Sequence, residues 1–203
     1  MYASVCHIFK KVCQYLSRYI HSSESQDQIG KASEGEASSV GKEANCQLEY
    51  RNLSLMERNE ILEIFNRIRI DDEDMLFDPH AFSYEGLEVI LAAKSDYYAI
   101  VFLKSEVIGY CLLRGIDEGY VDFSVGIFIF SNYRKMGYGR EIMSYLEAFA
   151  LSRNVTTLRL SVKQNNVVAK NLYTKLGYRK ITDKDDNFEI WTKYILSKTK
   201  RPE

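Results

Sequence analysis

The stretch R-K-M-G-Y-G at residues 134–139 decides the fold, because it joins an apolar run that ends at Phe130 to an amphipathic, helix-like segment. A helix N-terminus presents unpaired amide N–H groups and the positive end of the helix dipole, so it binds anions readily. The two glycines let backbone approach a phosphate, and Arg134 and Lys135 can add charge-assisted contacts. Taken alone, the pattern fits either a phosphate-binding loop or a basic loop that closes a turn.

Two better-known phosphate loops are excluded by spacing. The P-loop pattern G-x-x-x-x-G-K-[ST] needs four residues between its glycines, but five separate Gly35 from Gly41, and Lys42 is followed by Glu43. The dinucleotide pattern G-x-G-x-x-G would need a third glycine where Ile142 stands.

A second informative segment, N-V-V-A-K-N-L-Y-T-K-L-G-Y, occupies residues 166–178. Asn166, Ala169 and Tyr173 recur at helical spacing, and Gly177 is a natural helix C-cap. Asn166 is also favoured as the N-cap of this helix. Tyr173, taken alone, would be read as a packed helix aromatic.

Together the two segments resemble the GNAT superfamily of N-acetyltransferases. The resemblance covers about 47–195 in element order, and its specific part is 124–178, with R-x-x-G-x-G followed by N-x-x-A-x-x-x-Y-x-x-x-G-[FY]. Two positions depart from the family pattern: Lys135 stands where glycine is common, and Ser131 where proline is common. The resemblance implies acetyl-CoA as co-substrate.

The resemblance also implies roles for individual residues. The splayed end of the strand around Ile127 and Ile129 would offer backbone groups to the pantetheine arm, and an amide there would polarise the thioester carbonyl. Asn166 would hydrogen-bond the cofactor, and Tyr173 would protonate the departing thiolate as a general acid. The pyrophosphate would be wrapped by the amides of Lys135, Met136, Gly137, Tyr138, Gly139 and Arg140. The Arg134 side chain could add a charge-assisted contact.

The acceptor implied is a primary amine that attacks the acetyl carbon directly. Asp122, expected on a strand over 120–130, is a candidate catalytic base, although a strand-edge acid in water is an equally good interpretation. The acidic run 71–74 could attract a cationic amine, but a solvated acidic turn explains it as well.

The segment F-D-P-H-A-F at 77–82, with L-L-R-G-I-D-E-G-Y at 112–120, resembles GNAT members of amino-sugar and polysaccharide synthesis. His80 could serve there as a polar contact or a base. An amino-sugar nucleotide is therefore one candidate acceptor. Protein N-termini, lysines and small amines remain open, as does a non-catalytic module that only binds acetyl-CoA.

The order of elements predicts an α+β fold with a mixed, mostly antiparallel central sheet flanked by helices. Short turns at 104–106 and 115–119 favour antiparallel hairpins in the first half, and strands alternate with helices later. The sequence predicts strands over 47–52, 98–103, 107–114, 120–130, 156–162, 178–182 and 188–196, and helices over 57–69, 84–93, 138–152 and 166–176.

The chain before residue 46 is predicted to be an extension of the GNAT domain at 46–203. Residues 1–21 carry an apolar stripe at helical spacing, which fits a helix docked on the domain or a partner, a membrane-surface helix, or an acid-poor targeting peptide. Residues 22–45 are rich in Ser, Gly and Glu without any aromatic residue, which predicts a flexible linker.

Composition excludes several classes of function. A net charge of −1 in 203 residues gives no global indication of nucleic-acid binding. The three histidines do not cluster and no two of the four cysteines have C-x-x-C spacing, so no metal site is expected. We expect reduced thiols and a cytoplasmic protein. The oligomeric state is left open.

Overall fold

The computed structural model describes residues 47–195, and these contain seven strands and four α-helices in the predicted order. They are β1 (Leu48–Asn52), α2 (Arg58–Asp71), α3 (Tyr84–Leu91), β2 (Tyr97–Leu103), β3 (Glu106–Arg114), β4 (Phe123–Ile129), α4 (Tyr138–Ser152), β5 (Thr157–Lys163), α5 (Val167–Lys175), β6 (Arg179–Asp183) and β7 (Phe188–Tyr194). The predicted α+β class is confirmed. The predicted helix over 1–21 and linker over 22–45 lie outside the described residues.

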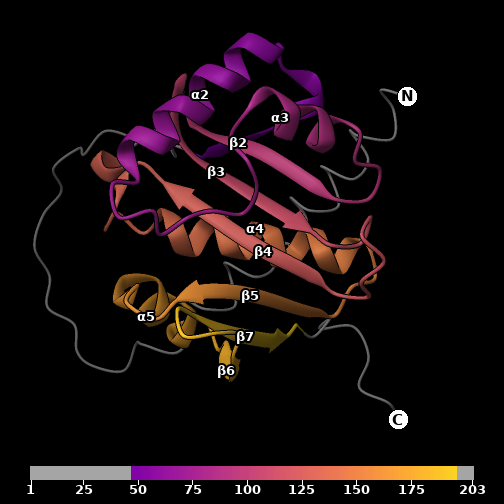
Figure 1. The fold of residues 1–203 in the computed structure, drawn as a ribbon, viewed down its shortest axis with the longest axis vertical. Coiled ribbons are helices and arrows are strands. Elements are labelled where there is room, and N and C mark those ends of the chain that lie inside the picture. Colours follow the sequence, from indigo (N-terminus) through magenta and orange to yellow (C-terminus); the bar gives the residue numbers. More distant parts are fainter. Residues whose placement is uncertain (1–46, 196–203) are drawn as a thin grey trace, which may run out of the picture.

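One sheet runs through the described part in the order β1-β2-β3-β4-β5-β7-β6. Only the β4–β5 pair is parallel, and every other neighbouring pair is antiparallel. Figure 1 shows α2 and α3 on one face of the sheet and α4 on the other. The sheet is therefore mixed and mostly antiparallel, as predicted.

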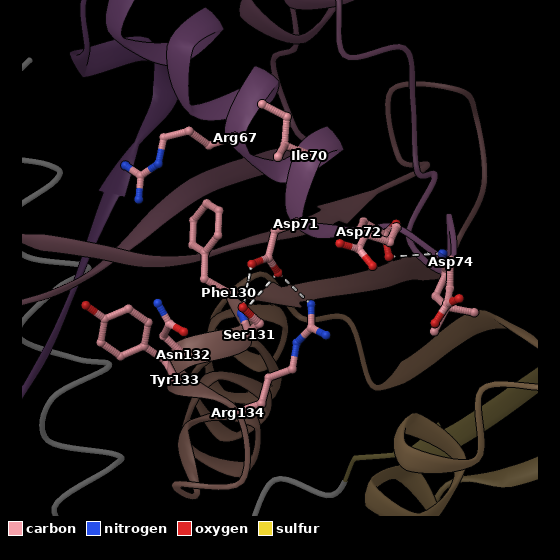
Figure 2. Close-up of a pocket in the computed structure, with 12 residues that line it drawn as sticks. Arg67, Ile70, Asp71, Asp72, Asp74, Phe130, Ser131, Asn132, Tyr133 and Arg134 are labelled. Atoms are coloured by element: carbon pink, nitrogen blue, oxygen red, sulfur yellow. Dashed lines mark hydrogen bonds and ion pairs between the residues drawn. The ribbon is translucent and has the colours of Figure 1, made fainter.

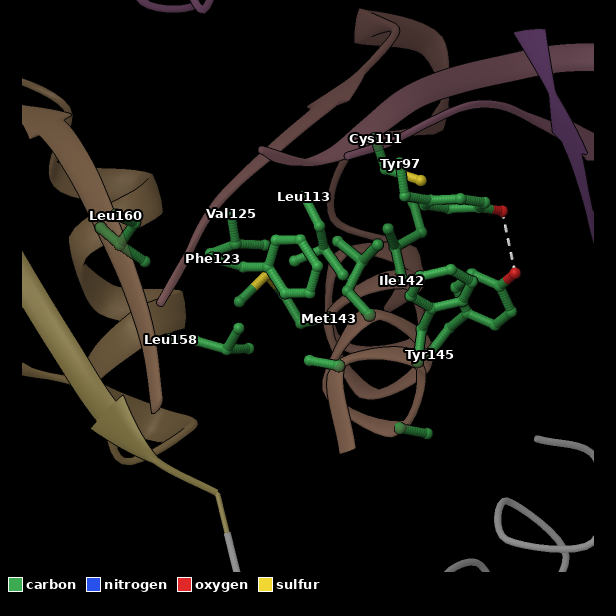
Figure 3. Close-up of a cluster of buried hydrophobic side chains, with 14 of the residues drawn as sticks. Tyr97, Cys111, Leu113, Phe123, Val125, Ile142, Met143, Tyr145, Leu158 and Leu160 are labelled. Carbon is green, nitrogen blue, oxygen red and sulfur yellow. Dashed lines mark hydrogen bonds between the residues drawn. The ribbon is translucent and has the colours of Figure 1, made fainter. Parts of the chain in front are cut away.

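Each face of the sheet carries its own apolar core, because side chains alternate along the strands. Under α4, the side chains of Ile142 and Met143 pack against Leu113 and Phe123 (Figure 3). On the other face, α2 and α3 cover a second core that includes Tyr110 from β3. A register slip by one residue would move each side chain of the central strands from one core to the other.

The prediction that a strand covers 120–130 was wrong at its start. The last pair between β3 and β4 is Arg114–Ser124, so the connecting turn reaches Asp122 instead of ending at residue 119. Two carboxylates hold this longer turn against the start of β2. Asp117 accepts hydrogen bonds from the amides of Lys94, Ser95 and Asp96, and Asp96 accepts from Gly115 and Asp117.

Cys111, on β3, is the cysteine that falls within the described residues, and its thiol is free and fully buried. Burial in apolar surroundings raises the pKa of this thiol, because the thiolate would be poorly solvated. Cys111 therefore contributes to packing. In the described range, no helix has the length and apolar character needed to cross a membrane.

Candidate active site

The parallel strands β4 and β5 separate almost as soon as they begin. They pair only at Phe123–Leu158 and Ser124–Arg159, although each strand is seven residues long. Beyond Ser124, the side of β4 that faces β5 has no partner strand within 47–195. A backbone edge inside the sheet is thus left open to a ligand.

The open edge of β4 carries the backbone groups of Ile127 and Ile129. The amide of Phe130 donates to the carbonyl of Ile108 on β3 (3.0 Å), and hydrogen-bonding direction alternates along an antiparallel pair. The N–H and C=O groups of Ile127 and Ile129 therefore point away from β3, toward the gap. Their side chains lie near Gly139, at the start of α4.

The loop between β4 and α4 is shaped by two left-handed residues. Lys135 has φ 63° and Gly137 has φ 92°. The family's preference for glycine at position 135 has this physical basis, because an L-residue is disfavoured in the left-handed region by about 1–2 kcal/mol. Gly137 is the N-cap of α4 and has no side chain with which to cap the helix.

The loop leaves a run of amides unpaired. From Lys135 through Met136, Gly137 and Tyr138 to Gly139, no backbone N–H donates a hydrogen bond to another residue within 47–195. The amide of Arg140 closes the first turn on the carbonyl of Gly137 (3.0 Å). Five successive free N–H groups at the positive end of a 15-residue helix form an arrangement suited to an anion.

Arg134 is held by protein groups at the start of this loop. Its Nε donates to the carbonyl of Ile129 (2.8 Å), and its terminal nitrogen forms an ion pair with Asp71 at the end of α2 (2.8 Å; Figure 2). The sequence suggested a contact with phosphate. In the structure, the guanidinium of Arg134 donates to the carbonyl of Ile129, which lies on the open edge of β4 next to the loop.

Helix α5 packs against the same region and positions Tyr173. A Cβ at Gly139 would lie 3.0 Å from a terminal methyl group of Leu172, so glycine leaves room there for a side chain of α5. Tyr173 is 7% exposed, and its hydroxyl forms no hydrogen bond with any residue in 47–195. Burial raises the pKa of Tyr173 to about 12, so the hydroxyl stays protonated near neutral pH.

The ends of α5 follow the sequence-based expectations. The Asn166 side chain accepts from the amide of Ala169 (3.1 Å), which confirms its N-cap role. Gly177 has φ 85°, and the next amide, of Tyr178, donates to the carbonyl of Tyr173 (3.0 Å). This geometry is a Schellman-type C-cap, which the glycine permits.

Asp122 lies just before β4 and lines a cleft of about 280 Å³ where β4 and β5 begin to separate. Ser124 and Arg159, the last paired residues, line the same cleft. Its charged lining residues are Arg114, Glu118, Asp122, Arg159 and Lys184. None of these five forms an ion pair within the described part of the chain. The sequence pointed to Asp122 but not to the three cations.

His80 occupies an aromatic cluster under α2 and α3. Its Nδ1–H is assigned as donor to the carbonyl of Ala81 (3.1 Å), so its Nε2 accepts from the buried hydroxyl of Tyr110 (2.8 Å). Burial lowers the pKa of His80, the backbone contact opposing this in part. Both ring nitrogens are engaged, which favours the polar-contact interpretation over that of a base.

His80 should make stability depend on pH near its ordinary pKa of about 6.5. The pKa of His80 is lower in the folded protein than in the unfolded chain, so the unfolded chain binds more protons as pH falls. The free energy of unfolding therefore decreases toward low pH, by at most about 1.4 kcal/mol per pH unit. We expect the free energy of unfolding, measured by urea denaturation, to fall more between pH 7.5 and pH 5.5 for wild type than for His80→Asn. Equal losses would contradict the neutral, buried imidazole.

A parallel pair that splays open, a free amide loop at a helix N-terminus and a buried tyrosine form an arrangement suited to a CoA thioester. A model of the acetyltransferase (GNAT) family matches residues 59–178. The chain therefore belongs to the GNAT acetyltransferase family, and it is an acetyl-CoA-dependent N-acetyltransferase.

Several acetyltransferases are similar to this chain in sequence or in fold. Among curated proteins, an N-alpha-acetyltransferase of Sulfurisphaera tokodaii has 28% identity over 153 residues, 68% of this chain and 86% of the relative. Among solved structures, Campylobacter jejuni N-acetyltransferase PseH in complex with acetyl coenzyme A has a TM-score of 0.55 and 22% identity, covering 73% of this chain and 99% of that one. A mutant of the spermidine N-acetyltransferase SpeG from Vibrio cholerae has a TM-score of 0.57 and 18% identity, covering 74% of this chain and 95% of that one. The two structural likenesses support the fold.

Proposed function

We propose that acetyl-CoA lies along the open edge of β4 and that an amine reaches it from the cleft at Asp122. The observation that carries this proposal is the loss of β4–β5 pairing after Ser124, which leaves the backbone of Ile127 unpartnered within 47–195, beside α5. The N–H of Ile129 and both backbone groups of Ile127 fit the amide groups of a pantetheine arm. The carbonyl of Ile129 is already occupied by Arg134.

The residues of this chain would act on the thioester in two ways. Acetyl-CoA supplies the activated acetyl group when bound. A backbone N–H on the open edge of β4 polarises the thioester carbonyl, as in an oxyanion hole. Tyr173 gives its proton to the sulfur as the C–S bond breaks, and its raised pKa keeps the hydroxyl protonated near neutral pH until then.

The loop amides from Lys135 to Gly139 would hold the pyrophosphate. They are unpaired within the described residues, they converge on the start of α4, and Gly137 and Gly139 remove the side chains that would block approach. The amine must either arrive unprotonated or lose a proton in the site before it attacks. Asp122, in the adjoining cleft, is the carboxylate we propose as its proton acceptor, directly or through water.

The charges of the cleft support an acceptor that carries an anionic group as well as an amine. Asp122 and Glu118 suit an ammonium group, whereas Arg114, Arg159 and Lys184 suit a phosphate or carboxylate. An amino-sugar nucleotide combines both kinds of group in one molecule. It is the acceptor that we favour.

A protein N-terminus is the second candidate, since the curated relative is named an N-alpha-acetyltransferase. A peptide backbone would have to lie in the same cleft, with the α-amine beside Asp122. A lysine or a small amine would use the carboxylates alone. A cytoplasmic location and any contact through residues 1–21 stay predictions.

Release of free thiol from acetyl-CoA should distinguish these acceptors, with amino-sugar nucleotides, peptides and polyamines as substrates. We expect Arg159→Gln to raise KM for an amino-sugar nucleotide about tenfold, because one charge-assisted contact is lost, and to leave KM for a polyamine within twofold. Arg179→Gln, on the exposed edge strand β6, is the matched control. An equal effect of Arg159→Gln on both acceptors would contradict the anionic-acceptor proposal, and peptide turnover alone would favour the second candidate.

A further inference from the structure

The last residue of α2, Asp71, is bound to the chain segment that follows β4, sixty residues later. Its carboxylate accepts hydrogen bonds from the amide of Ser131 (3.0 Å) and the hydroxyl of Ser131 (2.7 Å), and it pairs with Arg134 (2.8 Å). Figure 2 shows the three side chains converging at the end of α2. The Asp71 side chain is only 18% exposed. One carboxylate thus fixes both ends of the turn 131–134.

The neighbouring acidic residues have different surroundings. Asp72 accepts from the amides of Leu76 and Phe77, so it closes its own local turn. Asp74 is exposed and forms no hydrogen bond or ion pair with any residue in 47–195. All four residues of the acidic run 71–74 line one cleft with residues 130–134, and Asp71 is the one whose carboxylate bonds to that segment within 47–195.

The contacts of Asp71 determine where the free amides lie. The turn 131–134 lies directly before Lys135 and Gly137, whose left-handed conformations set the course of the loop into α4. By orienting Arg134, Asp71 also places a donor on the carbonyl of Ile129. Without that donor, the partial negative charge of the carbonyl would lie uncompensated next to the amides.

The ion pair also explains how an acid is tolerated next to an anion site. A lone carboxylate at the end of α2 would repel a pyrophosphate, but the guanidinium of Arg134 neutralises it at 2.8 Å. The pair presents little net charge, and the positive field of the loop then comes from the amides and the helix N-terminus.

We propose that Asp71 is a positioning residue for acetyl-CoA binding, which holds the loop 131–139 in its binding conformation through Ser131 and Arg134. The inference rests on the proposed cofactor site. It assigns to a residue on α2 a part in the affinity for acetyl-CoA, without contact with the reacting atoms.

The test is acetyl-CoA binding measured by calorimetry, together with steady-state kinetics, on full-length protein. We expect Asp71→Asn to weaken acetyl-CoA affinity and raise its KM about tenfold, with kcat at saturation within twofold of wild type. Asp74→Asn, the matched control, should change neither. The double variant Asp71→Asn/Arg134→Gln should bind no worse than the weaker single variant, since the two residues act as one unit.

A folded Asp71→Asn protein that binds acetyl-CoA within twofold of wild type would overturn the inference and leave the proposed function intact. If Asp71→Asn does not fold, Ser131→Ala takes its place, because it removes only the hydroxyl contact. We expect about threefold weaker binding from Ser131→Ala, and unchanged binding would overturn the inference. Failure of the wild type itself to bind acetyl-CoA would instead contradict the proposed function, and this inference with it.

Discussion

Replacing Tyr173 by phenylalanine should lower kcat about a hundredfold while acetyl-CoA affinity stays within twofold of wild type. The hydroxyl has no partner within residues 47–195, so its removal leaves no protein group unsatisfied, and the ring still fills its place against Tyr178. What disappears is the proton that neutralises the departing thiolate. Stopped-flow or steady-state thiol release, with binding measured by calorimetry, checks both halves of the expectation.

Tyr178→Phe is the matched control for this experiment. Tyr178 is also buried, and its ring lies beside that of Tyr173, with centroids 5.9 Å apart. Removal of its hydroxyl should leave kcat within twofold. If Tyr173→Phe kept full turnover, another group would have to donate the proton. If wild type bound acetyl-CoA but turned over no amine in a broad panel, the non-catalytic alternative would be favoured.

Replacing Gly137 by valine should weaken acetyl-CoA binding by roughly 30- to 150-fold. Gly137 has φ 92°, a region in which a β-branched residue is strained by about 2–3 kcal/mol. The free variant can relieve this strain by rearranging the loop, but binding requires the original course of the amides. The strain then reappears as lost affinity, at about 1.4 kcal/mol per factor of ten.

Gly119→Val separates this effect from a general loss of stability. Gly119 has φ 89° in the β3–β4 turn, and at both positions a Cβ would have no heavy atom within 4 Å. The two variants therefore introduce the same strain at different sites. We expect weakened acetyl-CoA binding only for Gly137→Val. Equal affinities in the two variants would show that the loop does not bind the cofactor.

The ends of helices were predictable because they depend on neighbours in the sequence. Asn166 caps α5 by bonding an amide three residues on, and Gly177 ends the same helix through its own backbone conformation. The glycines of 134–139 likewise marked the start of α4 at Tyr138. Such features are readable from residue type and spacing, since the interacting groups are covalently close.

The turn after β3 was not predictable in the same way. Its residues suggested a short hairpin ending at 119. In the structure, the carboxylates of Asp96 and Asp117 each accept a hydrogen bond from the backbone amide of the other residue, about twenty residues away, and hold a longer turn. The start of β4 and the position of Asp122 follow from this contact. No local pattern indicates that each of these two carboxylates binds the backbone of the other residue.

The sequence by itself determined the family, the order of elements, the glycine loop 134–139 at the start of α4 and the presence of Tyr173 on α5. Only the tertiary structure decided that Arg134 binds Asp71 and Ile129, that His80 accepts from Tyr110, and that three cations share a cleft with Asp122. The first group depends on periodicity and backbone conformation within one segment. The second depends on which segments the sheet brings together, because charge and hydrogen-bond partners are then chosen across the whole domain.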